Sequence, residues 1–390
     1  MHDTATQSPS HPDTRSIADW LRLEQADGVG CRTAKLLLDA FGSPAAIFRA
    51  GHAALAALVP SAQAAALRAP VKPELAARID LTLAWLLEPR HHILTLHDAD
   101  YPQALRHIPD PPLLLYIKGR RELLCEPMIA VVGSRNASTQ GKANAEGFAE
   151  SLSRAGLCVV SGMALGIDTA AHEGALRGAG STIAVIGTGP DRVYPARNRA
   201  LAHRIADEGC IVSEYALGTP PVASNFPRRN RIISGMAAGV LVVEAAAQSG
   251  SLITAQMAAE QGREVFALPG SIHSALAKGC HQLIREGAQL VETVDEVLEA
   301  MQASPLLHRA QPADIGKNAA RHEADHSCNQ GSAHEGLLSI LGHGPVEPDA
   351  LLSCLDTDAG WLAGELLTLE LAGLLERLPD GRVQRVVRAT

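Results

Sequence analysis

The sequence predicts an α/β protein built around a Rossmann-like, doubly wound, mostly parallel sheet, with a small helical N-terminal domain and a C-terminal winged-helix-like domain. Between about residues 90 and 300, short apolar runs alternate with amphipathic stretches, the pattern of parallel strands covered by helices on both faces. Aromatic residues make up only 3% of the chain while Gly and Ala are frequent, which suits close packing of helices on a sheet. At 390 residues the chain also exceeds what one core usually organises.

Composition divides the chain into five parts. We expect a disordered N-terminus at 1–16, a helical domain at 17–88, the Rossmann-like domain at 89–300, a flexible linker at 301–334 and the winged-helix-like domain at 335–390. The linker is rich in Ala, His, Gln, Asp and Ser and shows little apolar periodicity, which is typical of a flexible segment.

The helical domain contains a tight glycine turn, Gly28-Val29-Gly30, followed by an apolar helix at 36–41. The pattern resembles a helix-hairpin-helix, in which a glycine turn presents backbone N–H groups to a phosphate. A small packing module whose turn merely needs glycine would give the same pattern, and the sequence leaves both interpretations open.

Eight apolar runs of the central domain are predicted to be strands. They lie at 93–96, 113–117, 128–132, 157–160, 182–186, 211–212, 240–243 and 264–267. The helices between them begin after turns that contain Gly or Ser, so the functional loops are expected at the carboxyl ends of the strands.

The C-terminal domain is predicted to contain three helices, near 336–341, 348–355 and 359–374, followed by a strand pair that turns at 379–381. A winged helix usually reads DNA with basic residues on its third helix. Here that helix contains Glu365 and Glu370 and no Lys or Arg. We therefore expect this domain to contact protein, or to cap the core, rather than to enter a DNA groove.

Composition also limits where the protein acts and what it binds. The formal net charge of −8 confines any nucleic-acid site to a local basic patch. No run of about 18 uncharged apolar residues is present, and the polar N-terminus lacks the apolar core of a signal peptide, so we expect a cytoplasmic protein with no membrane partner. Seven scattered cysteines without a C-x-x-C pair predict reduced thiols rather than a disulfide framework or zinc ribbon.

Four predicted strands end in glycine loops suited to phosphate. The first loop offers a glycine for close approach, a hydroxyl and a guanidinium. The second and fourth offer glycines and a free helix N-terminus, and the third offers glycines followed by three arginines and a tyrosine, which can serve both phosphate and base. The residues are Gly133, Ser134 and Arg135 in the first loop; Ser161, Gly162 and Gly166 in the second; Gly187 and Arg197 in the third; and Ser249, Gly250 and Ser251 in the fourth. Several phosphate-binding loops at one sheet edge suit a repeating polyanion better than one compact nucleotide.

A fifth segment, at 225–235, carries three arginines and no acid. It contains Phe226, Arg228, Arg229, Asn230 and Arg231. An aromatic ring beside guanidinium groups offers both stacking and charge, a combination typical of single-stranded nucleic-acid sites. Phe226 is equally consistent with a buried anchor.

Other chemistries are less well supported. Asp168 and His172 lie four residues apart, a spacing that also fits a pair of metal ligands, but no third ligand is evident and we favour Asp168 as a cap that orients its loop. A zinc site formed by His322, His326, Cys328 and His334 is disfavoured by the composition of the linker. The chain contains no G-x-S-x-G elbow, no H-E-x-x-H and no Walker A lysine, so no enzyme activity and no cofactor are expected.

Taken in order, the motifs resemble the DNA-processing protein A family (DprA, also called Smf). The resemblance rests on Gly133-Ser134-Arg135, Ser161-Gly162-Met163-Ala164-x-Gly166-Ile167-Asp168, Phe226-Pro227-x-Arg229-Asn230-Arg231 and Ser249-Gly250-Ser251-Leu252. It implies a Rossmann-like, dimeric protein that binds and protects single-stranded DNA and loads the RecA recombinase onto it during natural transformation. It also implies that Arg135 holds a phosphate in a central pocket and that Arg228, Arg229 and Arg231 line a basic groove.

Two positions depart from the family pattern. Many relatives carry a lysine where this chain has Ala196, and Arg197 is the candidate replacement for that cation. An asparagine is usual where His281 stands. The competing hypothesis is a nucleotide-processing N-glycosidase on the same fold, which would need a Pro-Gly-Gly-x-Gly-Thr loop with a catalytic Arg and Glu. The matching region here offers only Ser249-Gly250-Ser251, with Glu244 nearby.

Overall fold

The computed structural model describes residues 14–303, 341, 345–348, 351–352, 359–378 and 381–386. Nine strands form one sheet in the order β1-β2-β6-β5-β4-β3-β7-β8-β9. Their bounds are β1 (His91–Thr95), β2 (Leu114–Gly119), β3 (Met128–Val132), β4 (Cys158–Ser161), β5 (Thr182–Ile186), β6 (Cys210–Ser213), β7 (Gly239–Val242), β8 (Glu264–Ala267) and β9 (Gln289–Leu290). The mostly parallel, Rossmann-like sheet is confirmed.

All eight predicted strands are present, with ends that differ from the prediction by at most two residues. β3 and β5 are buried along their whole length, which explains their continuous apolar runs. The sequence did not predict β9, because its two residues are exposed and produce no apolar run. It also did not predict that β1 pairs antiparallel with β2, and β2 with β6, at one end of the sheet.

The direction of strand addition reverses between β3 and β7. The chain adds β4 and β5 on one side of β3, and it adds β7, β8 and β9 on the other. In open parallel sheets, ligands bind outside the carboxyl ends of the two strands that flank such a reversal. The loops that follow β3 and β7 therefore occupy the position where this fold class binds its ligands.

The chain divides into two compact units. The first comprises residues 1–125 and 185–236, and the second comprises 126–184 and 237–390. The helices of the first unit are α1 (Thr14–Glu24), α2 (Cys31–Phe41), α3 (Pro44–Arg49), α4 (His52–Ala56), α5 (Ser61–Arg68), α6 (Pro73–Trp85), α7 (Gln103–Arg106), α10 (Arg199–Glu208) and α11 (Asn225–Met236). The second unit contains α8 (Thr139–Arg154), α9 (Ile167–Ala175), α12 (Gly250–Glu260), α13 (Lys278–Arg285), α14 (Val294–Ala303) and α18 (Ala359–Leu371).

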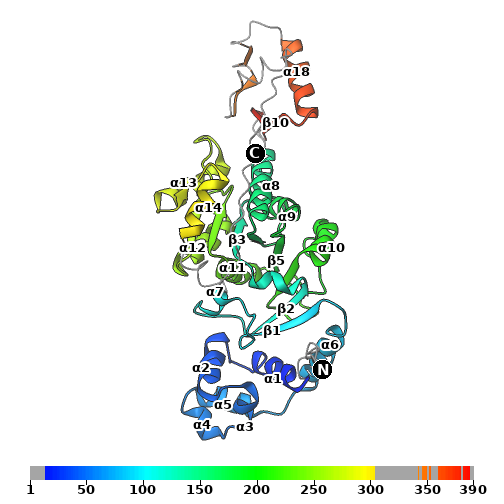
Figure 1. The fold of residues 1–390 in the computed structure, drawn as a ribbon, viewed down its shortest axis with the longest axis vertical. Helices are drawn as coiled ribbons and strands as arrows, with labels where there is room; N and C mark the ends of the chain where they lie inside the picture. The colour runs from blue at the N-terminus through cyan, green and yellow to red at the C-terminus, as the bar shows by residue number, and fades with distance from the viewer. Residues whose placement is uncertain are drawn as a thin grey trace, which may run out of the picture. The chain divides into compact units, whose positions relative to one another are not determined.

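In the second unit, α8 and α9 pack against each other (Figure 1). Apolar residues of both helices join those of β3 and β4 in one buried cluster that includes Ile129, Phe148, Leu152 and Ile167. This packing holds the start of α9 against the loop that follows β3, where a candidate site residue, Arg135, is located.

In the first unit, α1 to α6 form the predicted helical part of the chain (Figure 1). Gly28 has a φ of 75°, in the left-handed region that favours glycine, and Gln63 Nε2 donates to its carbonyl oxygen at 2.8 Å. The glycine turn is therefore present, and its contact with a phosphate stays a prediction. None of the helices in the described ranges combines the length and hydropathy that crossing a bilayer requires.

At the C-terminus, α18 is followed by an antiparallel hairpin of β10 (Leu375–Arg377) and β11 (Val383–Arg385). The hairpin confirms the predicted strand pair. The two shorter helices expected before α18 fall largely outside the described residues, as do the linker and its His322, His326, Cys328 and His334.

Candidate nucleic-acid interface

The loops that follow β3, β4 and β7 contact one another in the second unit. Ser134 N donates to Glu244 O at 2.7 Å, and Ile167 N donates to Ser134 O at 3.1 Å. A Cβ on Gly133 would lie 2.6 Å from Ile167 Cγ1 and 2.8 Å from Glu244 O, so only glycine allows this approach. The structure thus brings together the first two predicted loops, after β3 and β4, and the end of β7, which leads to the fourth predicted loop at Ser249.

Gly166 fixes the position of Arg135. Its φ is 81°, and a Cβ at this residue would lie 2.7 Å from Arg135 O. The Arg135 side chain is exposed, and its guanidinium has no ion-pair partner among the described residues. A rigid loop therefore presents an uncompensated positive charge beside the position where the strand order reverses.

Replacing Gly166 with alanine is expected to lower the free energy of unfolding by about 1–3 kcal/mol, because the new Cβ meets backbone in a left-handed conformation. Chemical denaturation measures this loss. Gly250→Ala is the matched control, since a Cβ there meets no atom of the described residues within 4 Å and should change stability little. Equal stability of the two variants would contradict the role assigned to Gly166.

The serines of these loops are largely engaged within the protein. Ser161 is buried and its Oγ donates to Val131 O at 2.7 Å. Ser134 Oγ accepts from Asn136 N at 3.2 Å. Ser249 caps α12, accepting from Ser251 N at 3.3 Å. Ser161 and Ser134 therefore stabilise the conformations of their loops. At the N-terminus of α12, Ser249 satisfies one backbone N–H, and the other N–H groups of the first turn can bind an anion.

Asp168 caps its own loop, as favoured above. Its Oδ2 accepts from Ala164 N at 3.2 Å, and the buried His172 places Nδ1 2.7 Å from Thr182 Oγ1. Met163, between β4 and α9, has a φ of 62°, a conformation that costs about 1–3 kcal/mol for a residue with a side chain. In the described ranges no group of three or more His, Cys, Asp or Glu is placed to hold a metal ion.

Glu244, the acid that an N-glycosidase would need, holds Ser138, the N-cap residue of α8. Its carboxylate accepts from Ser138 N at 3.0 Å and from Ser138 Oγ at 2.6 Å, at the N-terminus of α8. Burial raises the pKa of Glu244, and the bonds from Ser138 oppose that shift. A Cβ on Gly141 would lie 2.6 Å from Glu244 Oε1, so the carboxylate is enclosed by the first turn of the helix.

In the first unit, an aromatic pair lies beside the loop that follows β5. Phe226, at the start of α11, is half-buried, and a Cβ on Gly187 would lie 3.0 Å from its ring. The rings of Tyr194 and Phe226 have centroids 5.5 Å apart, and Tyr194 is 48% exposed. Phe226 is therefore both an anchor and one member of a partly exposed aromatic surface. Tyr194 was not among the predicted binding residues, although its position among Arg192, Arg197 and Arg199 in the sequence indicated such a role.

The arginines of residues 192–199 and of the arginine segment 225–235 fall into two groups. Those on the surface are Arg192, Arg197, Arg199 and Arg228. Arg229 and Arg231 are buried, with only 4% and 5% of their surfaces exposed. Arg229 donates to Val185 O within the fold. The exposed arginines remain candidates for phosphate binding, whereas the described positions of Arg229 and Arg231 assign them to the interior.

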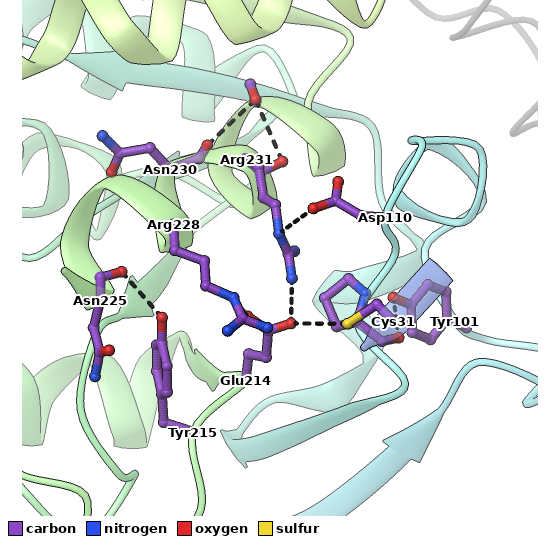
Figure 2. A network of polar contacts seen from close by, with 11 residues as sticks. Cys31, Tyr101, Asp110, Glu214, Tyr215, Asn225, Arg228, Asn230 and Arg231 are labelled. Carbon is purple, nitrogen blue, oxygen red and sulfur yellow. Dashed lines mark hydrogen bonds and ion pairs between the residues drawn. The ribbon is translucent and has the colours of Figure 1, made fainter. Parts of the chain in front are cut away.

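Figure 2 shows what holds Arg231. Its guanidinium pairs with the buried carboxylate of Glu214, and its Nε lies 3.1 Å from Asp110 Oδ2. Arg228 Nε lies 3.7 Å from Glu214 Oε2, and Cys31 Sγ lies 3.8 Å from Glu214 Oε1. Both acids come from other parts of the chain, so the arginine segment is less basic than its own sequence indicates.

Asn230 is half-buried, and its Oδ1 accepts from Arg229 Nε at 3.2 Å. Of the two departures from the family pattern, Ala196 is exposed and is followed by the exposed Arg197. His281 Nε2 lies 2.9 Å from Gly270 O, so the histidine has a polar contact at this turn.

Comparison with known proteins gives concordant matches. A family model described as DNA recombination-mediator protein A matches residues 92–302, and one described as the DprA winged helix domain matches residues 321–381. The second match confirms the winged-helix prediction.

Three relatives illustrate the similarity. The chain is 40% identical to the protein Smf of Escherichia coli (strain K12) over 78% of this chain and 80% of that protein. It is 51% identical to the DNA processing protein DprA of Streptococcus pneumoniae over 52% of this chain and 71% of that protein. An X-ray structure of DNA processing protein A from S. pneumoniae superposes with a TM-score of 0.63 and 37% identity, covering 74% of this chain and 98% of that one.

Proposed function

The chain belongs to the DNA recombination-mediator protein A family, and from that premise we propose that it binds single-stranded DNA through the exposed arginines and glycine loops described above. The observation that carries the proposal is a set of surface arginines beside an exposed aromatic pair, in a chain whose formal net charge is −8. Overall negative charge would repel DNA, so positive charge concentrated at these loops indicates local binding.

The second unit supports the proposal with charge and backbone donors. Arg135 has no ion-pair partner within the described ranges and lies at the loop that follows β3, next to the reversal of strand order. A guanidinium offers two parallel N–H groups to a phosphate. The N-terminus of α12 adds backbone N–H groups, which favour an anion.

The first unit supports it with stacking. Tyr194 and Phe226 expose aromatic surface, and Arg192, Arg197 and Arg199 lie in the same segment as Tyr194 or directly after it. Unpaired bases stack on such rings, whereas the bases of a duplex already stack on one another. This arrangement favours a single strand over a duplex, with little sequence preference, because phosphates carry no base information.

The finer parts of the proposal rest on the family resemblance. We propose that the protein protects the bound strand, loads RecA recombinase during natural transformation and acts as a homodimer without catalysis. The C-terminal domain is proposed to contact protein. Leu367 and Leu371 of α18 are 54% and 81% exposed while Leu362, Leu366 and Leu369 form its core, and the described helix carries no Lys or Arg.

The N-glycosidase alternative is not favoured, because Glu244 is enclosed at the α8 N-terminus by Ser138 and Gly141. Turnover of a nucleoside monophosphate by the purified protein would favour the N-glycosidase over the DNA-binding function.

Fluorescence anisotropy with a labelled single strand and its duplex, across a salt series, tests the proposal. We expect tighter binding of the single strand and a steep loss of affinity with salt. Arg135→Ala and Arg197→Ala should each weaken binding and reduce the salt slope by about one, the loss of one phosphate contact. Arg49→Ala removes an exposed arginine of the helical part and should leave both unchanged. Absent binding, or equal binding of the two DNAs, would reject the proposal.

A further inference from the structure

A cavity of about 220 Å³ in the first unit is lined by charged groups, and of these the proposed function uses Arg228 alone. Its lining includes Glu24 at the end of α1, Cys31 at the start of α2, Arg78 on α6, Glu214 after β6 and Arg228 on α11. The helical part of the chain thus reaches the same arginine that is proposed to bind DNA. Because the side chains come from four helices and the segment after β6, only the folded unit brings these charges together.

Glu214 has an incompletely satisfied carboxylate on the wall of this cavity. Its side chain is 7% exposed, and Oε1 pairs with Arg231. Oε2 is buried and accepts no hydrogen bond from the described residues. The charge that faces Oε2 is Arg228, with Nε at 3.7 Å, and 58% of the Arg228 side chain is exposed. One guanidinium therefore has two competing anionic partners, Glu214 inside and any phosphate outside.

Glu24 is the second carboxyl of the cavity. Burial raises its pKa to about 7 and nearby Glu214 adds to the rise, whereas a hydrogen bond from Gln25 and the charges of Arg78 and Arg228 lower it. The Cys31 thiol and the Tyr116 and Tyr215 hydroxyls are neutral near this pH, because burial raises the pKa of each.

Charge balance links the two carboxyls to DNA. With Glu24 ionised, the three acids Glu24, Glu214 and Asp110 face the three cations Arg78, Arg228 and Arg231. A phosphate bound to Arg228 would add a negative charge and draw the guanidinium away from Glu214 Oε2. The cluster would then hold an excess of negative charge in a poorly solvated site, which favours protonation of a carboxyl.

We propose that the Glu24–Glu214 cluster takes up one proton when a DNA phosphate binds to Arg228, so that strand binding tightens as the pH falls from the alkaline side toward neutrality. The cluster is thus a proton-binding site linked to the strand site. The inference rests on the proposed function, because it needs phosphate at Arg228.

Thermodynamic linkage between proton binding and DNA binding sets the direction of the pH dependence. Below the pKa of Glu24 in the free protein, the proton is already present and affinity does not depend on it. Above that value, binding must draw the proton from solution, so affinity falls with rising pH until the pKa of the DNA-bound state is passed. The window therefore begins at about pH 7 and extends upward.

Anisotropy titrations with a single-stranded oligonucleotide at fixed salt, from about pH 6 to about pH 9, test the inference in the full-length protein. We expect the wild-type Kd to rise about tenfold across this range, the effect of a one-unit difference between free and bound pKa values. Calorimetry in two buffers of different ionisation enthalpy should show net proton uptake near the middle of the range.

Glu24→Gln should remove most of the pH dependence and hold the affinity near the low-pH value of the wild type, since the amide resembles the neutral acid. Arg228→Ala should also flatten the profile, at weaker affinity. Glu74→Gln changes an exposed carboxylate on α6 and should keep the wild-type profile. A Glu24→Gln profile as steep as that of the wild type would overturn the inference. Absent strand binding at every pH would instead overturn the proposed function.

Discussion

Replacing Glu214 with alanine is expected to lower the free energy of unfolding of the first unit by about 3–5 kcal/mol. The change leaves Arg231 buried, with 6% of its side chain exposed, and removes the carboxylate it pairs with. Asp110 remains 3.1 Å from Arg231 Nε, but its side chain is 38% exposed and compensates only part of the charge. Chemical denaturation followed by tryptophan fluorescence measures the loss, since Trp20 and Trp85 both lie in this unit.

Glu208→Ala is the matched control. Glu208 lies at the end of α10 and pairs with Arg204 at 3.8 Å, with 55% of its side chain exposed. A pair of this kind contributes about 0–1 kcal/mol. A loss for Glu214→Ala no larger than that of Glu208→Ala would mean that Asp110 alone satisfies Arg231, and the assignment of Glu214 as its main partner would fail.

The strands were predictable from the sequence because buried parallel strands are apolar along their length. β3 and β5 are examples, and no long-range information is needed to find them. The order of strands could not be predicted in this way. The reversal between β3 and β7, which places Arg135, depends on which strands pair across the sheet, and local patterns do not contain that information.

In the arginine segment 225–235, too, the local sequence could not predict which side chains reach the surface. The sequence places Arg228, Arg229 and Arg231 in one basic block, yet α11 turns them to different sides. Arg228 reaches the surface, whereas Arg229 and Arg231 point into the fold. Glu214 and Asp110, which neutralise Arg231, are distant in sequence, so a local count of charge overestimates the basic surface.

The sequence predicted the loop glycines as positions where the backbone approaches a phosphate, and the structure shows that several of them are also needed for packing. Gly133 and Gly166 permit contacts between loops that a Cβ would block. Gly187 instead makes room for the ring of Phe226. At Gly250 a Cβ would meet no atom of the described residues within 4 Å, so packing within the described fold does not require a glycine there. The loops resemble one another in sequence because glycine serves all of these purposes.

A second large effect, on the affinity for a single strand, is expected at the exposed aromatic pair of Tyr194 and Phe226. Removing a ring on which a base stacks costs about 1–3 kcal/mol of binding free energy. Tyr194→Ala is therefore expected to raise the Kd for a single strand by about 5- to 150-fold. Tyr194 is 48% exposed, so its loss should change the stability of the fold little.

The test must separate stacking from charge and from the support that Tyr194 gives to Phe226. Tyr194→Phe keeps the ring and should bind nearly as the wild type does, whereas Tyr194→Leu keeps an apolar contact with Phe226 but should bind weakly. Because no charge is removed, the salt slope should be unchanged in all three variants, in contrast to Arg135→Ala. If Tyr194→Leu binds as tightly as Tyr194→Phe, bases do not stack on this ring, and strand binding depends on the arginines alone.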